Sequence, residues 1–277
     1  MERISIIRTT ALAVVVLAAA ALSASAADET SFGYDCEDCP ANWGNLSDDF
    51  AACFEGTKQS PIAFDRGSAK RKRLPRLRIS YGESPLKVER KETNFEAFVE
   101  EGSNAIRIRG KRFDLVQFHF HSTAEHVVDG ERAALEMHFV HRSRDGDLAV
   151  IGAFIEEGDN FDALDSLTNA LPAVAATPVG EELELEAVDV DALLPEDVSS
   201  YRYSGSTTTP PCTEGVQWIL LEEPLAFSEA QIEAIRATVR GFNLGFDNNR
   251  PIVERNGRRV TTDVAANDDD DDGDSDD

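Results

Sequence analysis

QFHFH at Gln117–His121, read together with EMH at Glu136–His138, decides how this sequence is interpreted. β-branched and aromatic residues flank both segments, which predicts two β-strands. Successive side chains of a strand point to opposite faces. The glutamine and the two histidines of the first segment therefore share one face, and its two phenylalanines share the other. The glutamate and histidine of the second segment face together in the same way, so each strand has one polar and one apolar face.

The connection between these strands predicts that they pair. Asp129-Gly130 is a dipeptide typical of tight hairpin turns, so the two strands can lie side by side and antiparallel. His119, His121 and His138 then converge. A lone histidine on a strand is more often a surface or structural residue. Three imidazoles without a fourth protein ligand are instead typical of a catalytic zinc site with one position open to water.

Polar neighbours of the three histidines fit the same interpretation. Gln117 and Glu136 lie on the ligand face, where they can accept the outer ring N–H of a ligand histidine and fix its tautomer.

The sequence resembles the α-class carbonic anhydrases, especially their bacterial members, in motifs spread from about residue 32 to about residue 264. Many short strands with few helices indicate a β-dominated α+β domain, and the resemblance implies a single domain around a large twisted, mostly antiparallel sheet. The matching motifs are NWG at 42–44, KQSPI at 58–62, QFHFH at 117–121, AEH at 124–126, LEMHFVH at 135–141, TTPPC at 208–212 and NNRP at 248–251.

The resemblance also implies an activity and its residues. Zn²⁺ held by the three histidines would supply a zinc-bound hydroxide that attacks CO2, giving bicarbonate and a proton. Thr208 and Glu125 would orient the attacking group. The resemblance further places Thr209 beside the substrate, an apolar wall for CO2 at Val140, Val150 and Trp218, Thr207 where the family usually has leucine, and Asn248 behind the metal ligands. A threonine in place of that leucine predicts a more polar pocket mouth.

The sequence departs from the family pattern at the proton shuttle. Fast family members use a histidine in the strand two turns before QFHFH, but all five histidines here belong to the metal motifs. Glu92 or Thr93 stands at the corresponding position. Buffer, or inefficiently Glu92, is therefore the expected proton carrier.

Two other interpretations remain open. His119-x-His121 followed by Glu125, with His138 later, resembles the ligand order of cupins, which would imply iron or manganese oxygen chemistry. A carbonic-anhydrase-like domain without catalytic activity is the other, although all three ligands and the Thr208/Glu125 pair are present.

Both ends of the chain differ from its middle. Residues 1–26 have a basic start, an apolar run and an Ala-x-Ala site at 24–26, which predicts a signal peptide and hence an exported, periplasmic or secreted protein. Residues 27–266 form the predicted domain. Residues 267–277 are nearly all aspartate, so a disordered, solubilising tail is expected, with weak calcium binding as the alternative.

Composition restricts the partners. A formal net charge of −25 argues against nucleic acid, since a polyanion would be repelled. No segment after the signal is apolar for long enough to span a membrane. The expected partner is a small-molecule substrate, CO2 or bicarbonate, and a monomer or homodimer is expected. The basic run at 70–73 predicts a solvated edge that pairs with surface carboxylates rather than a polyanion site.

Four cysteines in an exported chain are disulfide candidates. Three connectivities are possible if all of them pair, and the family resemblance selects Cys53 with Cys212. Cys36 and Cys39 lie outside the family pattern. For them a local disulfide, an intermolecular bridge and a metal or redox role all remain open.

Periodicity predicts further elements. Consecutive short strands are expected between residues 86 and 116, and other strands at 148–155 and 216–221. An amphipathic helix is expected at 160–171, and Ser228 is expected to cap a helix that runs to about Arg240.

Overall fold

The computed structural model describes residues 30–35, 37–74 and 77–264 of the 277-residue chain. The predicted signal peptide, the predicted acidic tail and Cys36 lie outside the described residues. Within them, a 13-stranded sheet dominates the fold, and its order is β11-β4-β5-β7-β9-β10-β13-β12-β15-β2. Additional strands attach to this path, because β14 pairs with β10, and β6 pairs with both β3 and β7. Most of the pairings are antiparallel, as predicted.

The sheet contains β2 (Lys70–Arg71), β3 (Arg78–Ser80), β4 (Glu83–Arg90), β5 (Phe95–Phe98), β6 (Ala105–Ile108), β7 (Lys111–Ser122), β9 (Leu135–Arg142), β10 (Leu148–Glu157), β11 (Glu182–Asp189), β12 (Ser200–Ser206), β13 (Glu214–Leu221), β14 (Leu225–Phe227) and β15 (Thr261–Thr262). A separate parallel pair consists of β1 (Ala63–Phe64) and β8 (Val127–Val128). The helices are α1 (Trp43–Leu46), α2 (Ala52–Glu55), α3 (Asp165–Ala176) and α4 (Glu229–Phe242), with short 3-10 turns at Asp48–Phe50, Arg66–Ser68, Asp162–Leu164 and Asp191–Leu193.

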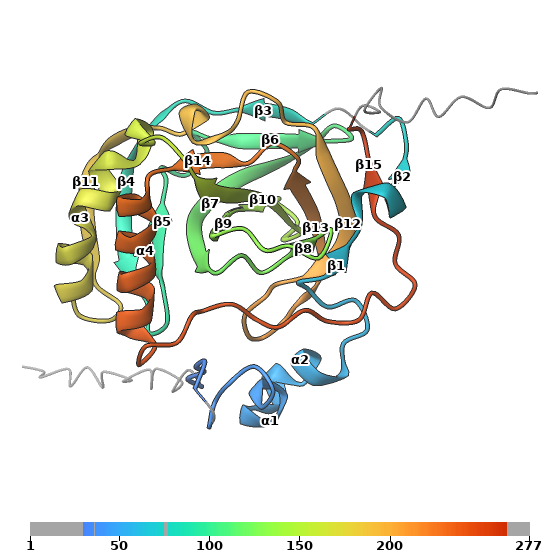
Figure 1. The fold of residues 1–277 in the computed structure, drawn as a ribbon, viewed down its shortest axis with the longest axis horizontal. Coiled ribbons are helices and arrows are strands. Elements are labelled where there is room, and N and C mark those ends of the chain that lie inside the picture. Colours follow the sequence, from blue (N-terminus) through green and yellow to red (C-terminus); the bar gives the residue numbers. More distant parts are fainter. Residues whose placement is uncertain (1–29, 36, 75–76, 265–277) are drawn as a thin grey trace, which may run out of the picture.

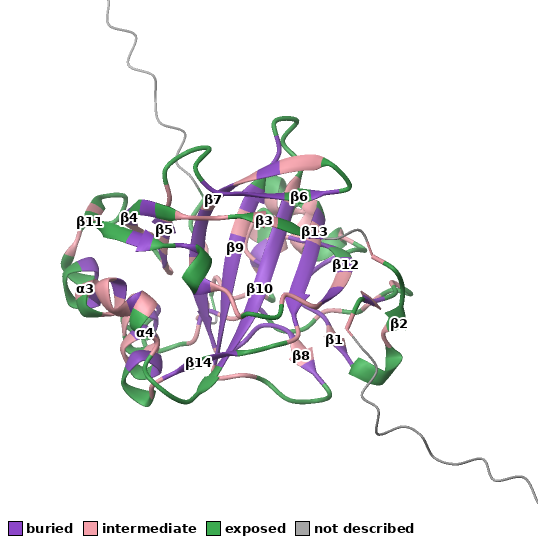
Figure 2. Cartoon of the chain, turned by 90° about the horizontal axis from the view of Figure 1, so that it is seen from above, coloured by how far each residue is buried: buried purple, intermediate pink, exposed green. Residues whose placement is uncertain are grey.

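Strands β7, β9 and β10 are buried along most of their length because they occupy the middle of the sheet (Figure 2). Helices α3 and α4 lie side by side next to β4, β5 and β7 (Figure 1). Their apolar stripes close the larger of two cores, which also takes in the phenylalanines of β7 and β9. The second core contains Trp218 and is formed largely by residues of β12, β13 and the β1–β8 pair.

The predicted hairpin forms with one qualification. Strands β7 and β9 pair antiparallel, with His119 directly opposite His138. The Asp129-Gly130 turn has positive φ at both residues, 52° and 81°, as a hairpin turn of this kind requires. It closes a local bridge between Val128 and Glu131 inside the connection, and does not join β7 to β9 directly.

Both predicted helices exist, and one starts later than expected. Ser228 caps α4 through a reciprocal capping box with Gln231. The helix predicted at 160–171 begins instead at Asp165, because the Asn160 side chain donates to Asp162 and Asp165 and residues 162–164 form a 3-10 turn. It then continues through Pro172 to Ala176. No helix of the described residues combines the length and apolarity needed to cross a membrane.

Candidate metal centre

Strands β7 and β9 bring three imidazoles together. Ring nitrogens of His119, His121 and His138 lie within 4.8 Å of one another. His121 and His138 are fully buried, while His119 is partly exposed. The pairing of His119 with His138 across the two strands, and the alternation that brings His121 to the same face, produce this arrangement directly. The predicted convergence of the three side chains is therefore present.

The outer nitrogen of each ring already has a hydrogen-bond acceptor. His119 Nδ1 lies 2.8 Å from Gln117 Oε1, and His121 Nδ1 lies 2.8 Å from the Asn248 carbonyl oxygen. His138 Nε2 lies 2.8 Å from Glu136 Oε1. All three acceptors lack a proton, so each ring must donate there. Each neutral ring then turns a lone pair toward the other two rings.

Two of these lone pairs lie so close together that they would repel each other in the absence of a cation. His119 Nε2 and His121 Nε2 are 3.1 Å apart, although the tautomers just derived leave neither atom with a proton to donate. A tetrahedral zinc ion with Zn–N bonds of about 2.0–2.1 Å would separate its nitrogens by about 3.3 Å. The residues therefore fit a divalent cation that accepts both lone pairs.

Burial keeps the three rings neutral. It is the largest cause that lowers the pKa of His119, of His121 (to about 4) and of His138, and Glu136 only partly opposes it. A metal ligand must be deprotonated. At neutral pH all three histidines are ready to bind without first losing a proton.

Glu136 accepts several hydrogen bonds beside the three histidines. Besides His138, its carboxylate accepts from the backbone N–H groups of Glu125 and His126, each at 2.9 Å, and from His126 Nδ1 at 2.7 Å. Burial raises the pKa of Glu136, but the two histidines outweigh it and hold that pKa well below the usual range. Since the other ring nitrogen of His126 lies 2.6 Å from the Tyr203 hydroxyl, His126 orients Glu136 and is not placed as a ligand.

Glu125 is fully buried next to the centre. Its Oε1 accepts the Arg250 backbone N–H at 2.8 Å. Burial raises its pKa to about 7, and the Thr208 hydroxyl is one of the groups that lower it again. Its Oε2 has no hydrogen-bond partner within the described residues.

Arg250 explains why motifs far apart in the sequence meet here. Its guanidinium donates to Gln59 Oε1 and to the Ser60 and Cys53 carbonyls at 2.8–2.9 Å. Through its backbone N–H the same residue holds Glu125. One buried arginine thus joins the early KQSPI segment, the disulfide and the polar residues beside the centre.

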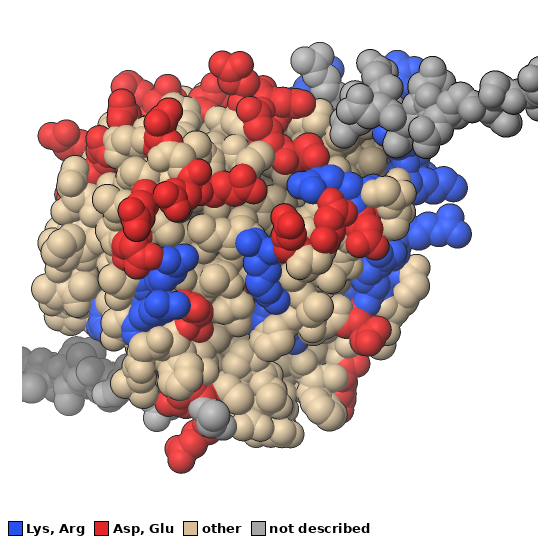
Figure 3. Space-filling model, viewed as in Figure 1, with Lys and Arg blue, Asp and Glu red and all other residues tan. Residues whose placement is uncertain are grey.

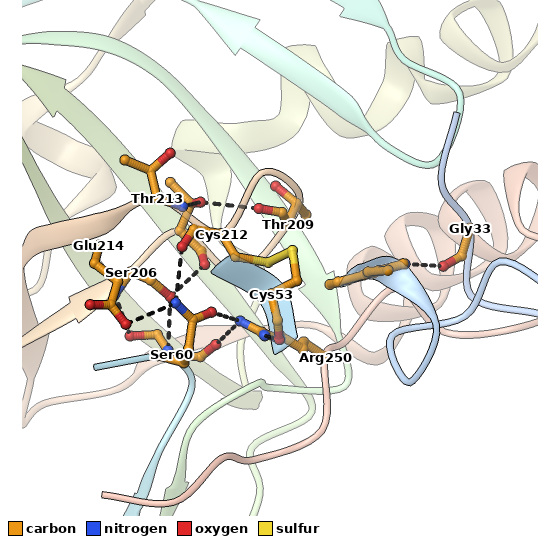
Figure 4. The surroundings of a disulfide bond; sticks show 12 residues. Gly33, Cys53, Ser60, Ser206, Thr209, Cys212, Thr213, Glu214 and Arg250 are labelled. Carbon is orange, nitrogen blue, oxygen red and sulfur yellow. Dashed lines mark hydrogen bonds between the residues drawn. A yellow bond between two sulfur atoms is a disulfide. The ribbon is translucent and has the colours of Figure 1, made fainter. Parts of the chain in front are cut away.

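The predicted disulfide is confirmed. Cys53 and Cys212 are joined across 159 residues of sequence. The bond fixes helix α2 to the loop at 207–213, which carries Thr208 and Thr209, and it lies beside Ser60, Ser206 and Arg250 (Figure 4). The bond therefore ties the loop that carries Thr208 to helix α2.

The three histidines open into a cavity of about 520 Å³. All residues that the sequence assigns to substrate binding line it: Val140, Val150, Thr207, Thr209 and Trp218. The Thr207 hydroxyl donates to the Thr209 carbonyl and accepts from the Thr213 N–H, both at 3.0 Å. Both hydrogen bonds of the Thr207 hydroxyl are therefore made within its own loop.

Glu89, Lys91, Glu92 and Glu96 also line the cavity, and we call them the charged wall. Glu92 lies in this wall, but it is exposed and accepts from the Ser31 hydroxyl at 2.6 Å. Glu96 was missed from the sequence. It is partly buried, its Oε1 accepts from Gln117 Nε2 at 3.1 Å, and Lys91 lies 3.6 Å from its Oε2. Burial raises the pKa of Glu96 above its usual value, with Glu89 adding to the rise and Lys91 opposing it.

Known proteins share both the sequence and the fold. The family model of eukaryotic-type carbonic anhydrases matches residues 38–264. A carbonic anhydrase of Neisseria gonorrhoeae is 35% identical over 249 residues, covering 90% of this chain and 94% of that protein. One from Pectobacterium carotovorum is 34% identical over 249 residues, covering 90% and 98%.

A solved structure of α-carbonic anhydrase from Thermovibrio ammonificans, in complex with sulfanilamide, superposes with a TM-score of 0.78. It is 35% identical, with 84% of this chain and 99% of that chain covered. These matches overturn the cupin alternative. The matched residues include both strands of the histidine cluster and the loop that the disulfide holds, so the chain belongs to the α-carbonic anhydrase family.

Proposed function

We propose that this carbonic anhydrase hydrates CO2 reversibly to bicarbonate and a proton at a zinc ion held by His119, His121 and His138. One observation supports this above all. Three neutral rings turn their lone pairs to one point, and each outer nitrogen is held by a separate acceptor. Zn²⁺ bound there would lower the pKa of a water molecule to about 7, which supplies the nucleophile near neutral pH.

Thr208 and Glu125 are proposed to orient the attacking oxygen. When Glu125 is ionised it can only accept a hydrogen bond, so the Thr208 hydroxyl must donate to it. The Thr208 oxygen is then left to accept the proton of the nucleophile. A lone pair of the nucleophile is thereby turned toward the substrate carbon.

The apolar side of the cavity is the proposed waiting place for CO2. Val140, Val150 and Trp218 line it, and Trp218 packs against the His138 ring with 4.8 Å between ring centroids. An uncharged, linear molecule needs no buried hydrogen-bond partner there. Thr209 at the mouth is proposed to contact the more polar product.

The proton released by hydration must leave along the charged wall. Glu92 stays a proposed carrier, and Glu96 is added because it lies deeper and is linked to His119 through Gln117. Its raised pKa brings it closer to that of the water it would serve, which favours proton transfer. Buffer molecules in the surrounding solution are the other proposed carrier of the proton.

The test combines metal analysis with stopped-flow CO2 hydration. We expect one zinc per chain in the wild type, and loss of both zinc and activity in His119→Ala with an unchanged circular dichroism spectrum. Thr208→Ala should keep zinc but lose about 10²-fold in kcat, as expected when a positioning group is removed. Full activity in His119→Ala, or stoichiometric iron or manganese in place of zinc, would contradict the proposal.

Residues 1–26 are proposed to export the chain to the periplasm or outside the cell. The disulfide is compatible with such a compartment. Mass spectrometry of the mature protein should find its N-terminus at Ala27, and an intact Met1 would contradict the assignment. The proposed monomer or homodimer is distinguished by light scattering.

A further inference from the structure

The end of the sheet carries a run of basic residues in an otherwise acidic molecule. β2 is the last strand of the sheet order, and Lys70, Arg71, Lys72 and Arg73, which we call the basic edge, are all exposed. Figure 3 shows Lys and Arg side chains gathered on the side of the molecule where β2 and β15 lie. Such a concentration of positive charge stands out in a chain of net charge −25.

Three of the four residues of the basic edge do not show the expected pairing with surface carboxylates. Lys70, Lys72 and Arg73 make no ion pair with any residue in the described part of the chain. Elsewhere on the same surface, lysines and arginines do find carboxylates, for example Lys111 with Asp145 at 2.7 Å. Three neighbouring cations therefore remain available for an anion.

The strand that precedes the acidic C-terminal run pairs with the strand that begins the basic edge. β15 is the strand that pairs with β2, and the two are parallel, with Thr261 opposite Lys70 and Thr262 opposite Arg71. The Lys72 N–H donates to the Thr262 carbonyl at 2.9 Å. A chain that continues beyond β15 therefore leaves next to Lys72 and Arg73.

Few residues separate that exit from the acidic run. The described structure ends at Val264, and eight of the ten residues from Asp268 to Asp277 are aspartate. Four residues span at most about 14 Å, while neighbouring strands are about 5 Å apart. The covalent link alone therefore allows the first aspartates to reach the basic edge, and a segment tethered this closely has an effective concentration in the millimolar range.

We propose that the acidic segment Asp268–Asp277 binds the basic edge of its own chain through ion pairs with Lys70, Lys72 and Arg73. Each exposed pair is weak by itself, but several of them on a tethered segment act together. The segment also occupies the cations that would otherwise attract external polyanions to an open sheet edge. The interaction is independent of the metal centre and of the proposed function.

Carbodiimide cross-linking tests the contact directly, since it joins a carboxylate to an amine only where they touch. In the full chain, peptides from residues 268–277 should be cross-linked to Lys70 or Lys72, and about 0.5 M NaCl should suppress the product. Lys87 on β4, an exposed lysine near the other end of the sheet, is the matched control. Equal cross-linking of the tail to Lys87 would overturn the proposal.

Binding of inorganic polyphosphate at low ionic strength supplies a second readout. Removing residues 268–277 should tighten binding about tenfold or more. In the Lys72→Glu, Arg73→Glu background, the same truncation should change the affinity by less than about twofold. If the truncation tightens binding equally in both backgrounds, the tail acts only through net charge and the proposal fails. CO2 hydration should be unchanged in all four proteins, because Lys72 and Arg73 do not line the cavity and the proposed contact involves no residue that does.

Discussion

Glu96 is the residue whose role is most directly tested by kinetics. We expect Glu96→Gln to lower kcat by about 10-fold in dilute buffer and to leave kcat/KM nearly unchanged, because the proton leaves after the carbon has reacted. Added imidazole buffer should restore the turnover. Stopped-flow hydration across a buffer series measures this effect.

The matched control is Glu92→Gln, which removes the more exposed carboxylate of the same wall. A larger loss in Glu92→Gln than in Glu96→Gln would show that the outer residue carries the proton. Equal turnover of both variants and the wild type in dilute buffer would assign proton transfer to buffer alone.

His141 makes the folded state sensitive to acid. Burial lowers its pKa from 6.5 to about 4, and its two nitrogens meet the Tyr81 hydroxyl and the Ala149 carbonyl. The unfolded chain therefore takes up a proton first as the pH falls. Stability is fully present above pH 6.5 and is lost progressively toward pH 4, by about 3 kcal/mol for this residue.

Guanidinium unfolding of zinc-free protein at several pH values checks this expectation. His141→Asn should unfold with a flatter pH dependence between pH 6.5 and pH 4 than the wild type. His121, whose pKa is also lowered to about 4, contributes equally to both proteins and cancels in the difference. Parallel pH profiles would contradict the assignment to His141.

The sequence predicted the convergence of three histidines because strand alternation and one turn dipeptide suffice for it. It did not predict Glu96, since the partner of β7 on its other side depends on the sheet order, which no local pattern encodes. The contact of Arg250 with Gln59 was equally hidden, because 191 residues separate the two in the chain. Local chemistry was readable from the sequence, whereas long-range pairing was not.

At the level of elements, the loop at 207–213 depends on its disulfide. Replacing Cys53 and Cys212 by serine should lower the free energy of unfolding by about 2–5 kcal/mol, because the bond closes a loop of 159 residues in the unfolded chain. The freed loop also carries Thr208, so kcat should fall in the same variant. Denaturant unfolding and stopped-flow hydration measure the two effects.

Wild-type protein treated with a reductant is the control, and it should match the double variant in both measurements. Unchanged kcat with lowered stability would mean that the hydrogen bonds of the loop alone position Thr208. An unchanged free energy of unfolding would contradict the role given to the bond.

Element boundaries show where periodicity stops being informative. Helix α4 was predicted well because Ser228 and Gln231 form a local cap. The start of α3 was misplaced by several residues, since Asn160 bonds to side chains further along and holds the first turn in a tighter conformation. A hydrophobic stripe identifies a helix, but side-chain hydrogen bonds decide where it begins.

Over the whole molecule, charge repulsion opposes folding. A net charge of −25 on 277 residues should make the protein more stable as salt is added, because screening weakens the repulsion. We expect Tm to rise by several degrees between about 10 mM and 0.5 M NaCl. Differential scanning calorimetry measures the change.

The variant that lacks residues 268–277 provides the comparison. Its Tm should depend less on salt, since eight carboxylates are absent. A Tm that falls with added salt in the full chain would show that attractive ion pairs outweigh the repulsion.

The large sequence separation between Asn248 and His121 has a consequence for biosynthesis. Its carbonyl holds His121 across 127 residues of chain. A nascent polypeptide that has already displayed all three histidines still lacks this support until the ribosome has added more than a hundred further residues. We therefore expect the proposed metal to bind only after residue 248 has been synthesised, and a protein truncated before residue 248 should emerge as an apoprotein even where zinc is abundant.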